Sequence, residues 1–314
     1  MMERLESRAL SPLVARSLVL LAECGVPSAS LAGAEAAGNV DSLSALPPAD
    51  EFFARYVRPG RPCVLRQLLA SAPGWTPFAR FSDFEYLRTR CGHRRVLVKA
   101  LGLVDKERRR VFVSDPELKL PLVDYLEMVE ATERDGAHCP FYLGKVSLRS
   151  ELPELNQDLE AAAHAWPLGP LAPCFGELIP QGVFTYFGVG RQVTATHFDP
   201  NENLLCCLSG SKRLWLYPPS DAEFLYPSPS SDGSRASAPP FQLHEELPQA
   251  VRGTFADVAR TRGPVEVRLE AGDAFYLPVG WWHCVEGSHD RNMILNFWMR
   301  VHPAKRHAAG ADAC

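Results

Sequence analysis

Short extended segments separated by turns fill the chain from residue 184 onward, and no long helical period interrupts them. Apolar and polar residues alternate within several of these segments, which is typical of strands that bury one face. The pattern therefore predicts a β-rich unit made of short strands. The predicted strands are residues 184–189, 196–199, 204–208, 212–217, 265–269, 274–277, 283–286 and 293–300.

Helical and extended patterns alternate in the first part of the chain. Apolar residues at helical spacing predict a helix over 7–23, and Gly25 and Pro27 end it. After a tether rich in Ala, Ser and Gly over 28–46, Asp50 is a candidate N-cap for a second helix. The first part of the chain is therefore expected to be of mixed α/β type.

Three residues of the later part form a candidate metal site. His197 and Asp199 are two residues apart in a predicted strand, so their side chains point to the same side. His283 follows Trp281 and Trp282 on an apolar strand, where an imidazole needs a partner or a ligand. Two histidines and one carboxylate hold Fe(II) on one face and leave the opposite positions open.

Two further polar residues lie in apolar strands. Lys212 alternates with Leu214 and Leu216, and an inward-facing lysine is costly without an anion. Lys212 is therefore a candidate clamp for a carboxylate. A buried amide at Asn296 also needs partners, and a cofactor carboxylate would be one. Trp298 on the same strand is expected to be a core residue.

Eight short strands around a metal site favour a double-stranded β-helix, the jelly-roll or cupin architecture. The chain has His-x-Asp, a lysine thirteen residues after the aspartate, and a distal histidine in a Leu-Pro…Trp-Trp-His context. This pattern resembles the Jumonji-C family, the cupin-like branch of the Fe(II)/2-oxoglutarate oxygenases. The chain is most similar to the small stand-alone hydroxylases, which act on asparaginyl, lysyl or arginyl side chains or on tRNA wybutosine. The resemblance runs from about residue 51 to 298.

The resemblance implies a mainly β fold with flanking helices, in which a Jumonji-C barrel follows an α/β N-terminal segment. A Ser- and Pro-rich stretch over 227–243 predicts a mobile insertion on the rim of this barrel. We divide the chain into a helix with a flexible segment (1–46), an α/β part (47–183), a barrel with a rim insertion at about 227–262 (184–303), and a disordered tail (304–314).

The resemblance also implies an enzyme that uses Fe(II), with 2-oxoglutarate as co-substrate and O₂. His197, Asp199 and His283 would be the catalytic metal ligands. Lys212 matches the position of the family's carboxylate clamp. The remaining matches to cofactor-binding positions are Thr194, Tyr142, Asn203 and Asn296. The expected activity is hydroxylation of a protein side chain with release of succinate and CO₂.

Composition indicates the cellular compartment and the class of partner that are expected for this activity. The chain has 314 residues, a net charge of −4 and nine cysteines without a CxxC pair. Scattered thiols predict a reducing compartment, the cytoplasm or nucleus. No run of eighteen apolar residues occurs, so no membrane partner is expected. The near-neutral charge favours a protein or peptide partner over RNA, and the basic run 106–110 is either a solvated loop or a docking patch.

Three alternatives to protein hydroxylation stay open. The same chemistry could act on a tRNA base, or it could remove a methyl group from N-methyl-lysine, since demethylation begins as hydroxylation of a methyl carbon. A non-catalytic cupin-like binding module would not need the carboxylate clamp at Lys212. Relatives often dimerise through helices outside the barrel, so the helix predicted over 7–23 is a candidate for homodimer formation.

Overall fold

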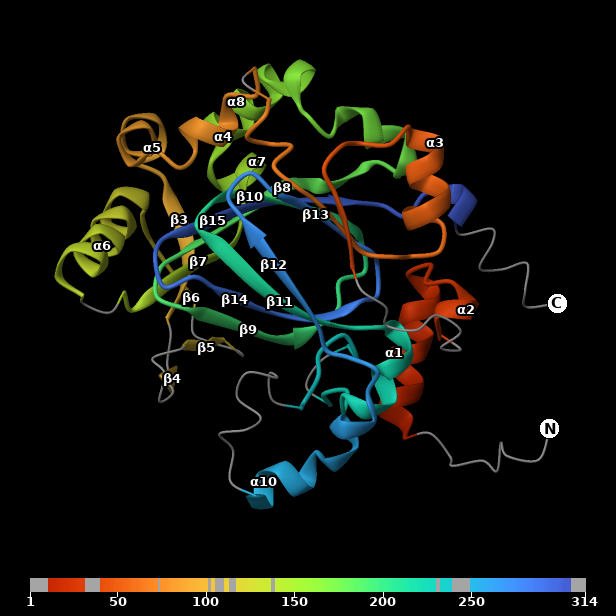
Figure 1. Cartoon of the computed structure of the whole chain (residues 1–314). Helices are drawn as coiled ribbons and strands as arrows, with labels where there is room; N and C mark the ends of the chain where they lie inside the picture. The colour runs from red at the N-terminus through yellow and green to blue at the C-terminus, as the bar shows by residue number, and fades with distance from the viewer. Residues whose placement is uncertain are drawn as a thin grey trace, which may run out of the picture.

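Two β-sheets packed against each other form the centre of the molecule (Figure 1). This computed structural model describes residues 11–31, 40–72, 74–100, 103–104, 110–112, 117–136, 139–229, 232–238 and 249–305. Buried apolar side chains from both sheets meet in one cluster, which includes Leu205, Leu214 and Leu277. This shared core explains why strands of both sheets point apolar side chains inward.

The larger sheet has the strand order β1-β2-β13-β10-β15-β8-β7-β3-β6. Its strands are β1 (Asp41–Leu43), β2 (Cys63–Leu65), β13 (Ala274–Leu277), β10 (Glu202–Ser209), β15 (Asn292–Met299), β8 (Leu178–Gly188), β7 (Phe141–Ser147), β3 (Arg95–Ala100) and β6 (Glu117–Pro121).

The smaller sheet has the order β12-β11-β14-β9-β5-β4. Its strands are β12 (Val265–Glu270), β11 (Ser211–Tyr217), β14 (Trp282–Gly287), β9 (Gln192–His197), β5 (Arg110–Phe112) and β4 (Leu103–Val104). The basic run predicted over 106–110 lies outside the described residues except for Arg110, which begins β5.

Helices cover the outside of the sheets, with α5 and α6 on one side and α1, α2 and α3 on the other (Figure 1). The α-helices are α1 (Pro12–Glu23), α2 (Ser28–Leu31), α3 (Ala49–Phe52), α4 (Pro77–Arg80), α5 (Phe84–Cys91), α6 (Leu122–Asp135), α7 (Leu148–Glu151), α8 (Pro153–Ala161) and α10 (Gln249–Thr254). The π- and 3₁₀-helices are η1 (Phe53–Val57), η2 (Ala163–Ala165), η3 (Gly169–Cys174), η4 (Pro219–Phe224) and η5 (Ala256–Arg260). Within the ranges described above, no helix is long and apolar enough to cross a membrane.

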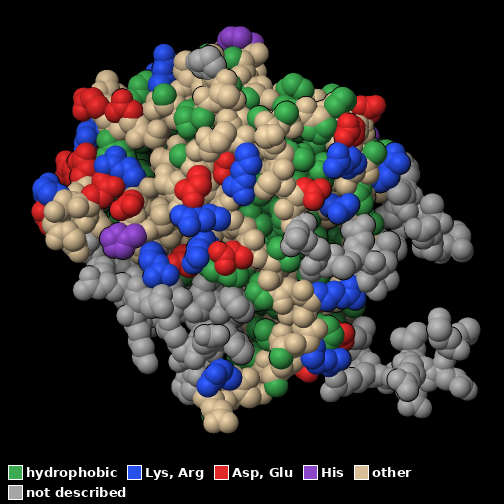
Figure 2. Space-filling model, viewed as in Figure 1, with side chains coloured by type: hydrophobic (Ala, Val, Ile, Leu, Met, Phe, Trp, Pro, Cys, Tyr) green, Lys and Arg blue, Asp and Glu red, His purple; other side chains and the backbone are tan. Residues whose placement is uncertain are grey.

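Ion pairs tie α5 to its neighbouring helices. Arg88 pairs with Glu130 of α6, and Arg90 pairs with Asp158 of α8 at 3.0 Å. Figure 2 shows acidic and basic side chains interspersed over this part of the surface. Such mixed charge suits the small net charge of the chain.

The eight strands predicted from residue 184 onward all form, as β8 to β15. One boundary matters for the site, because β9 ends at His197 and Asp199 lies beyond it. The prediction that both residues share a strand is therefore wrong. His197 is the last residue of β9 to pair with β14, and Pro200 has no N–H to extend a ladder.

The N-terminal predictions are partly confirmed. Helix α1 forms with Ser11 as N-cap, and residues 1–10 lie outside the described part. Asp50 is not an N-cap, because α3 begins one residue earlier, after Pro48, and Asp50 occupies its first turn. The predicted tether over 28–46 contains α2 and β1, and β1 pairs in parallel with β2.

The predicted C-terminal tail begins too early. Lys305 is fully buried and belongs to the folded part, whereas residues 306–314 lie outside the described residues. Its contacts are described below.

Helix α1 packs closely on the turn that precedes β14. Gly280 in this turn has φ +81°, and a Cβ there would lie 2.4 Å from Val26 and 2.9 Å from Leu21. Both contacted side chains are buried, at 2% and 0% exposed, so neither can move away freely.

We therefore expect Gly280→Ala to lower the free energy of unfolding in two ways. Positive φ costs an alanine about 1–2 kcal/mol, and the clash with Val26 and with Leu21 of α1 adds ~1–3 kcal/mol. Urea denaturation measures both. Gly136→Ala is the matched control, since Gly136 has φ +65° with no atom within 4 Å of its Cβ position. Equal losses in the two variants would contradict the close packing of α1.

Candidate active site

A cavity of about 720 Å³ lies between the sheets and is lined by strands of both. All eight predicted site residues line it, although they are spread over 155 positions of the sequence, from 142 to 296. These residues are Tyr142, Thr194, His197, Asp199, Asn203, Lys212, His283 and Asn296. The fold therefore brings the complete predicted set to one place.

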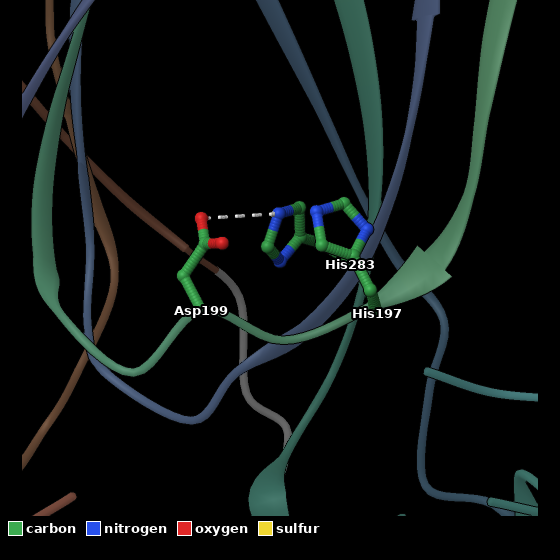
Figure 3. A group of neighbouring side chains, drawn as sticks. All are labelled: His197, Asp199 and His283. Atoms are coloured by element: carbon green, nitrogen blue, oxygen red, sulfur yellow. Dashed lines mark ion pairs between the residues drawn. The ribbon is translucent and has the colours of Figure 1, made fainter. Parts of the chain in front are cut away.

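His197, Asp199 and His283 converge at one end of this cavity (Figure 3). Their ligand atoms all lie within 4.8 Å of one another, and His283 Nε2 is 3.9 Å from Asp199 Oδ2. The two histidines are direct partners across β9 and β14, with ring centroids 4.3 Å apart. Within the described residues this is the group of side chains suited to hold one metal ion.

Main-chain carbonyls orient both imidazoles. His197 Nδ1 lies 2.8 Å from Ala195 O, and His283 Nδ1 lies 2.9 Å from Trp281 O. A carbonyl only accepts, so each Nδ1 carries the proton and each Nε2 keeps its lone pair for a metal. Burial and the neighbouring His283 lower the pKa of His197 to about 4. At neutral pH this imidazole is uncharged, which is the form that binds metals.

Lys212 lies in the same cavity, farther along β11. It stands four residues from Leu216, which is the partner of His283, so about 13 Å of strand separates the two positions. Its side chain is 2% exposed, and none of the ion pairs between described residues includes it. Its ammonium group lies 5.6 Å from the centre of the Tyr142 ring. A buried cation without an anionic partner is costly, so this arrangement suits an anion in the cavity.

Several buried polar atoms of residues that line the cavity have no hydrogen-bond partner among the described residues. These are both amide atoms of Asn203, Oδ1 of Asn296 and Nε1 of Trp298. Asn203 and Trp298 are direct partners across β10 and β15. Buried polar atoms are nearly always hydrogen-bonded, so these groups suit a polar ligand. Together with the triad and Lys212 they fit Fe(II) and a dicarboxylate such as 2-oxoglutarate.

Comparison with known proteins decides the family. A family model for the cupin-like domain matches residues 49–305, most of the chain. The chain belongs to the cupin-like family. This result and the relatives below confirm the predicted Jumonji-C fold and the predicted enzyme class, the 2-oxoglutarate-dependent oxygenases.

Relatives of this cupin-like protein are named for several different activities. It is 29% identical over 262 residues to the human bifunctional peptidase and (3S)-lysyl hydroxylase JMJD7, covering 79% of both chains. It is 28% identical over 251 residues to lysine-specific demethylase JMJ30 of Arabidopsis thaliana, covering 79% of this chain and 52% of that protein. It is 26% identical over 274 residues to tRNA wybutosine-synthesizing protein 4 of Neurospora crassa, covering 83% of this chain and 20% of the other.

Two further residues predicted to bind the co-substrate, Thr194 and Tyr142, lie on different strands of the cupin-like barrel, and Trp298 lies on a third. Thr194 of β9 is the cross-strand partner of Val285, two residues after His283. Tyr142 of β7 is buried, and burial raises the pKa of its hydroxyl, which stays a neutral donor. Trp298 is buried as predicted but also lines the cavity. Its alternation with Asn296 could have revealed this, since residues two apart on a strand share a face.

The predicted rim insertion contributes a wall of the site that sequence reasoning missed. Asp232, Ser234 and Arg235 line the cavity, and Arg235 forms an antiparallel bridge with His197. Ser234 O accepts a hydrogen bond from Phe198 N at 2.9 Å. A Ser- and Pro-rich composition has no strand periodicity, so this pairing could not be predicted from the residues alone. Residues 239–248 of the insertion lie outside the described part.

Helix α1 contacts this wall through Ser17. The buried hydroxyl of Ser17 donates to Gly233 O at 2.6 Å, and Gly233 has φ +104°. A Cβ at Gly233 would lie 3.1 Å from Ser17 Oγ, so only glycine permits this approach.

On the opposite wall, Lys145 lies at an irregularity in the pairing of β7 with β8, with φ +63°. Its ammonium group is 4.8 Å from the centre of the Trp298 ring. The irregularity turns this side chain toward the cavity, which it lines.

The burial of Lys212 can be tested by a stability measurement that does not require enzyme turnover. Burial lowers its pKa to about 8 from the ordinary 10.5. Between these values the unfolded chain binds more protons than the folded chain, so stability rises with pH across this window. Met has similar length and no charge, so we expect Lys212→Met to stabilise the ligand-free protein at pH 7 by ~1–3 kcal/mol. This gain should shrink from about pH 8 upward.

Urea denaturation at neutral pH and at about pH 9.5 measures this difference. Arg213→Met is the control, because Arg213 is the next residue on the same strand and its side chain is 47% exposed. We expect the control to change stability by less than about 0.5 kcal/mol at either pH. A destabilised Lys212→Met protein at neutral pH would contradict a buried, unpaired ammonium group.

Proposed function

We propose that this protein hydroxylates a side chain of a protein or peptide, using Fe(II), 2-oxoglutarate and O₂ and releasing succinate and CO₂. One observation carries the proposal: a two-histidine, one-carboxylate set shares one cavity with a buried lysine that forms no ion pair with any described residue. A metal site alone would suit many cupin-like proteins. A cation buried at a distance from it is needed only when a second, anionic ligand binds there.

His197, Asp199 and His283 would hold Fe(II), and Lys212 would neutralise the far carboxylate of 2-oxoglutarate. When bound, these groups and O₂ supply the oxidation of a C–H bond, coupled to conversion of 2-oxoglutarate into succinate and CO₂. Thr194 and Tyr142 would donate hydrogen bonds near Lys212. Asn203 and Asn296 have unpartnered amide atoms that would bind the polar parts of the co-substrate.

A protein or peptide substrate is supported by the kinds of relatives found. The human relative is named as a lysyl hydroxylase and the Arabidopsis thaliana relative as a lysine-specific demethylase. The net charge of −4 does not favour nucleic acid, although one relative is named for tRNA wybutosine synthesis. Demethylation would need the same residues, so the substrate decides between the two outcomes.

The cytoplasm or nucleus is part of this proposal. The eight cysteines that lie in the described ranges are all free thiols, which suits a reducing compartment. Homodimer formation through α1 stays a prediction. This helix buries Val14 and Leu21 within its own chain, whereas Val19 on the same helix is 56% exposed.

Succinate formation tests the proposal directly. We expect purified protein with Fe(II), 2-oxoglutarate and ascorbate to form succinate, and a cell lysate depleted of small molecules to stimulate this. Loss of stimulation after protease treatment supports a protein substrate. Loss after nuclease treatment would instead indicate RNA, and formaldehyde release would indicate demethylation. A protein that neither forms succinate nor binds 2-oxoglutarate would be a binding module.

His197→Ala and Asp199→Ala should each abolish this turnover, by about 100-fold or more, because each removes one of three metal ligands. Both variants should keep the circular dichroism spectrum of the wild type. His289→Ala is the matched control, since its side chain is 85% exposed and lies outside the cavity. Full activity in either ligand variant would disprove the metal assignment.

Lys212→Met should raise the 2-oxoglutarate concentration that gives half-maximal turnover by about tenfold or more, since an ion pair with the co-substrate is lost. Binding of Mn(II) without 2-oxoglutarate should change little. Arg213→Met again serves as the control on the opposite face of β11. An unchanged 2-oxoglutarate requirement in Lys212→Met would move the carboxylate clamp to another residue.

A further inference from the structure

A completely buried ion pair lies close to the metal-binding segments but outside the cavity. Lys305 Nζ is 2.5 Å from Glu202 Oε1, and both side chains are 0% exposed. Neither residue lines the cavity. Removing two charges from water costs free energy, so this pair is expected to have a specific structural role.

The carboxylate of Glu202 connects several parts of the fold. Its second oxygen accepts hydrogen bonds from Tyr276 Oη at 2.8 Å and from Val279 N at 3.1 Å. Glu202 therefore holds the turn 278–281 to the beginning of β10. Lys305 supplies the positive charge, and no other ion pair between described residues involves Glu202.

Both segments joined by Glu202 carry metal ligands. Glu202 follows Asp199 by three residues, and Val279 precedes His283 by four. Gly280 N donates to Asp199 O at 3.1 Å, so the two segments are also joined directly. The carbonyl of Trp281, in the same turn, accepts the hydrogen bond that orients His283.

We propose that Lys305 is a positioning residue for the metal site. Its ammonium group pairs with the buried carboxylate of Glu202, and Glu202 fixes the turn 278–281 against the segment of Asp199. The spacing between Asp199 and His283 depends on this connection, so the C-terminal lysine sets the affinity of the site for metal. This inference rests on the metal site of the proposed function.

Loss of Lys305 would leave the Glu202 carboxylate buried without a cation. A buried charge without a partner is strongly destabilising, so the loss should weaken the packing that holds Glu202 against Val279 and Tyr276. A neutral amide needs no countercharge and still accepts from Val279 N. Replacing both members of the pair should therefore restore much of the Mn(II) affinity that is lost when the lysine alone is removed.

The test compares Mn(II) affinity with stability in the full chain. Lys305→Met should raise the Mn(II) dissociation constant about tenfold, as loss of residues that orient ligands does in other metal sites. The double variant Glu202→Gln/Lys305→Met should return to within about threefold of the wild type. Titration with Mn(II) followed by electron paramagnetic resonance gives the constants, and thermal unfolding gives the stability.

Arg66→Met is the matched control for a role in stability alone. Arg66 pairs at 2.7 Å with Asp273, a carboxylate that is 1% exposed and bonds no segment carrying a ligand. We expect this variant to lose stability and to keep the wild-type affinity for Mn(II). Lys305→Met with lowered stability and unchanged Mn(II) affinity, or a double variant no better than Lys305→Met, would overturn the proposal.

Should Lys305→Met fail to fold, the double variant Glu202→Ala/Lys305→Met replaces it. It carries neither buried charge and lacks the side chain that accepts from Val279 N. A Mn(II) affinity in this folded variant equal to that of Glu202→Gln/Lys305→Met would then reject the role. Failure of the wild type to bind Mn(II) through His197 would reject the proposed function instead, so the two failures are distinguishable.

Discussion

Antiparallel pairing of β9 with β14 is the interaction on which the site depends. It makes His197 and His283 direct neighbours, although 86 positions separate them in the sequence. The main-chain hydrogen bonds of this pair set the distance between the imidazoles, and carbonyls two residues back set the rotation of each ring. The third ligand, Asp199, follows where the chain leaves the sheet, so it approaches the same point from another direction.

The barrel contains both an apolar core and a polar cavity, and the two have opposite effects on stability. Its core needs apolar side chains to hold the sheets together, whereas the cavity between them holds Lys212, Asn203 and Asn296. Buried polar groups without partners destabilise a protein. The ligand-free fold is therefore less stable at these positions than an apolar barrel would be, and binding an anion relieves that cost.

Local patterns predicted much of this structure, and their limits have physical reasons. Short extended segments bounded by turns identified all eight strands from β8 to β15. Alternation alone would not have identified β10, β13 and β15, because they are buried on both faces. His-x-Asp and the distal histidine identified the ligands, but they did not show that β9 ends at His197, before Asp199. The wall at 232–235 and the burial of Lys305 depend on partners far away in the sequence. Such pairings leave no periodic signal near the residues themselves.

The wall formed by residues 232–236 is attached mainly through its own backbone. Ser234 O accepts from Phe198 N, Ala236 N donates to Thr196 O at 2.9 Å, and Gly233 O accepts from Ser17. The side chains of Asp232, Ser234 and Arg235 line the cavity beside this backbone pairing. Substitutions at these three positions would therefore change the shape and charge of the cavity wall, while the backbone that pairs with β9 beside His197 is kept.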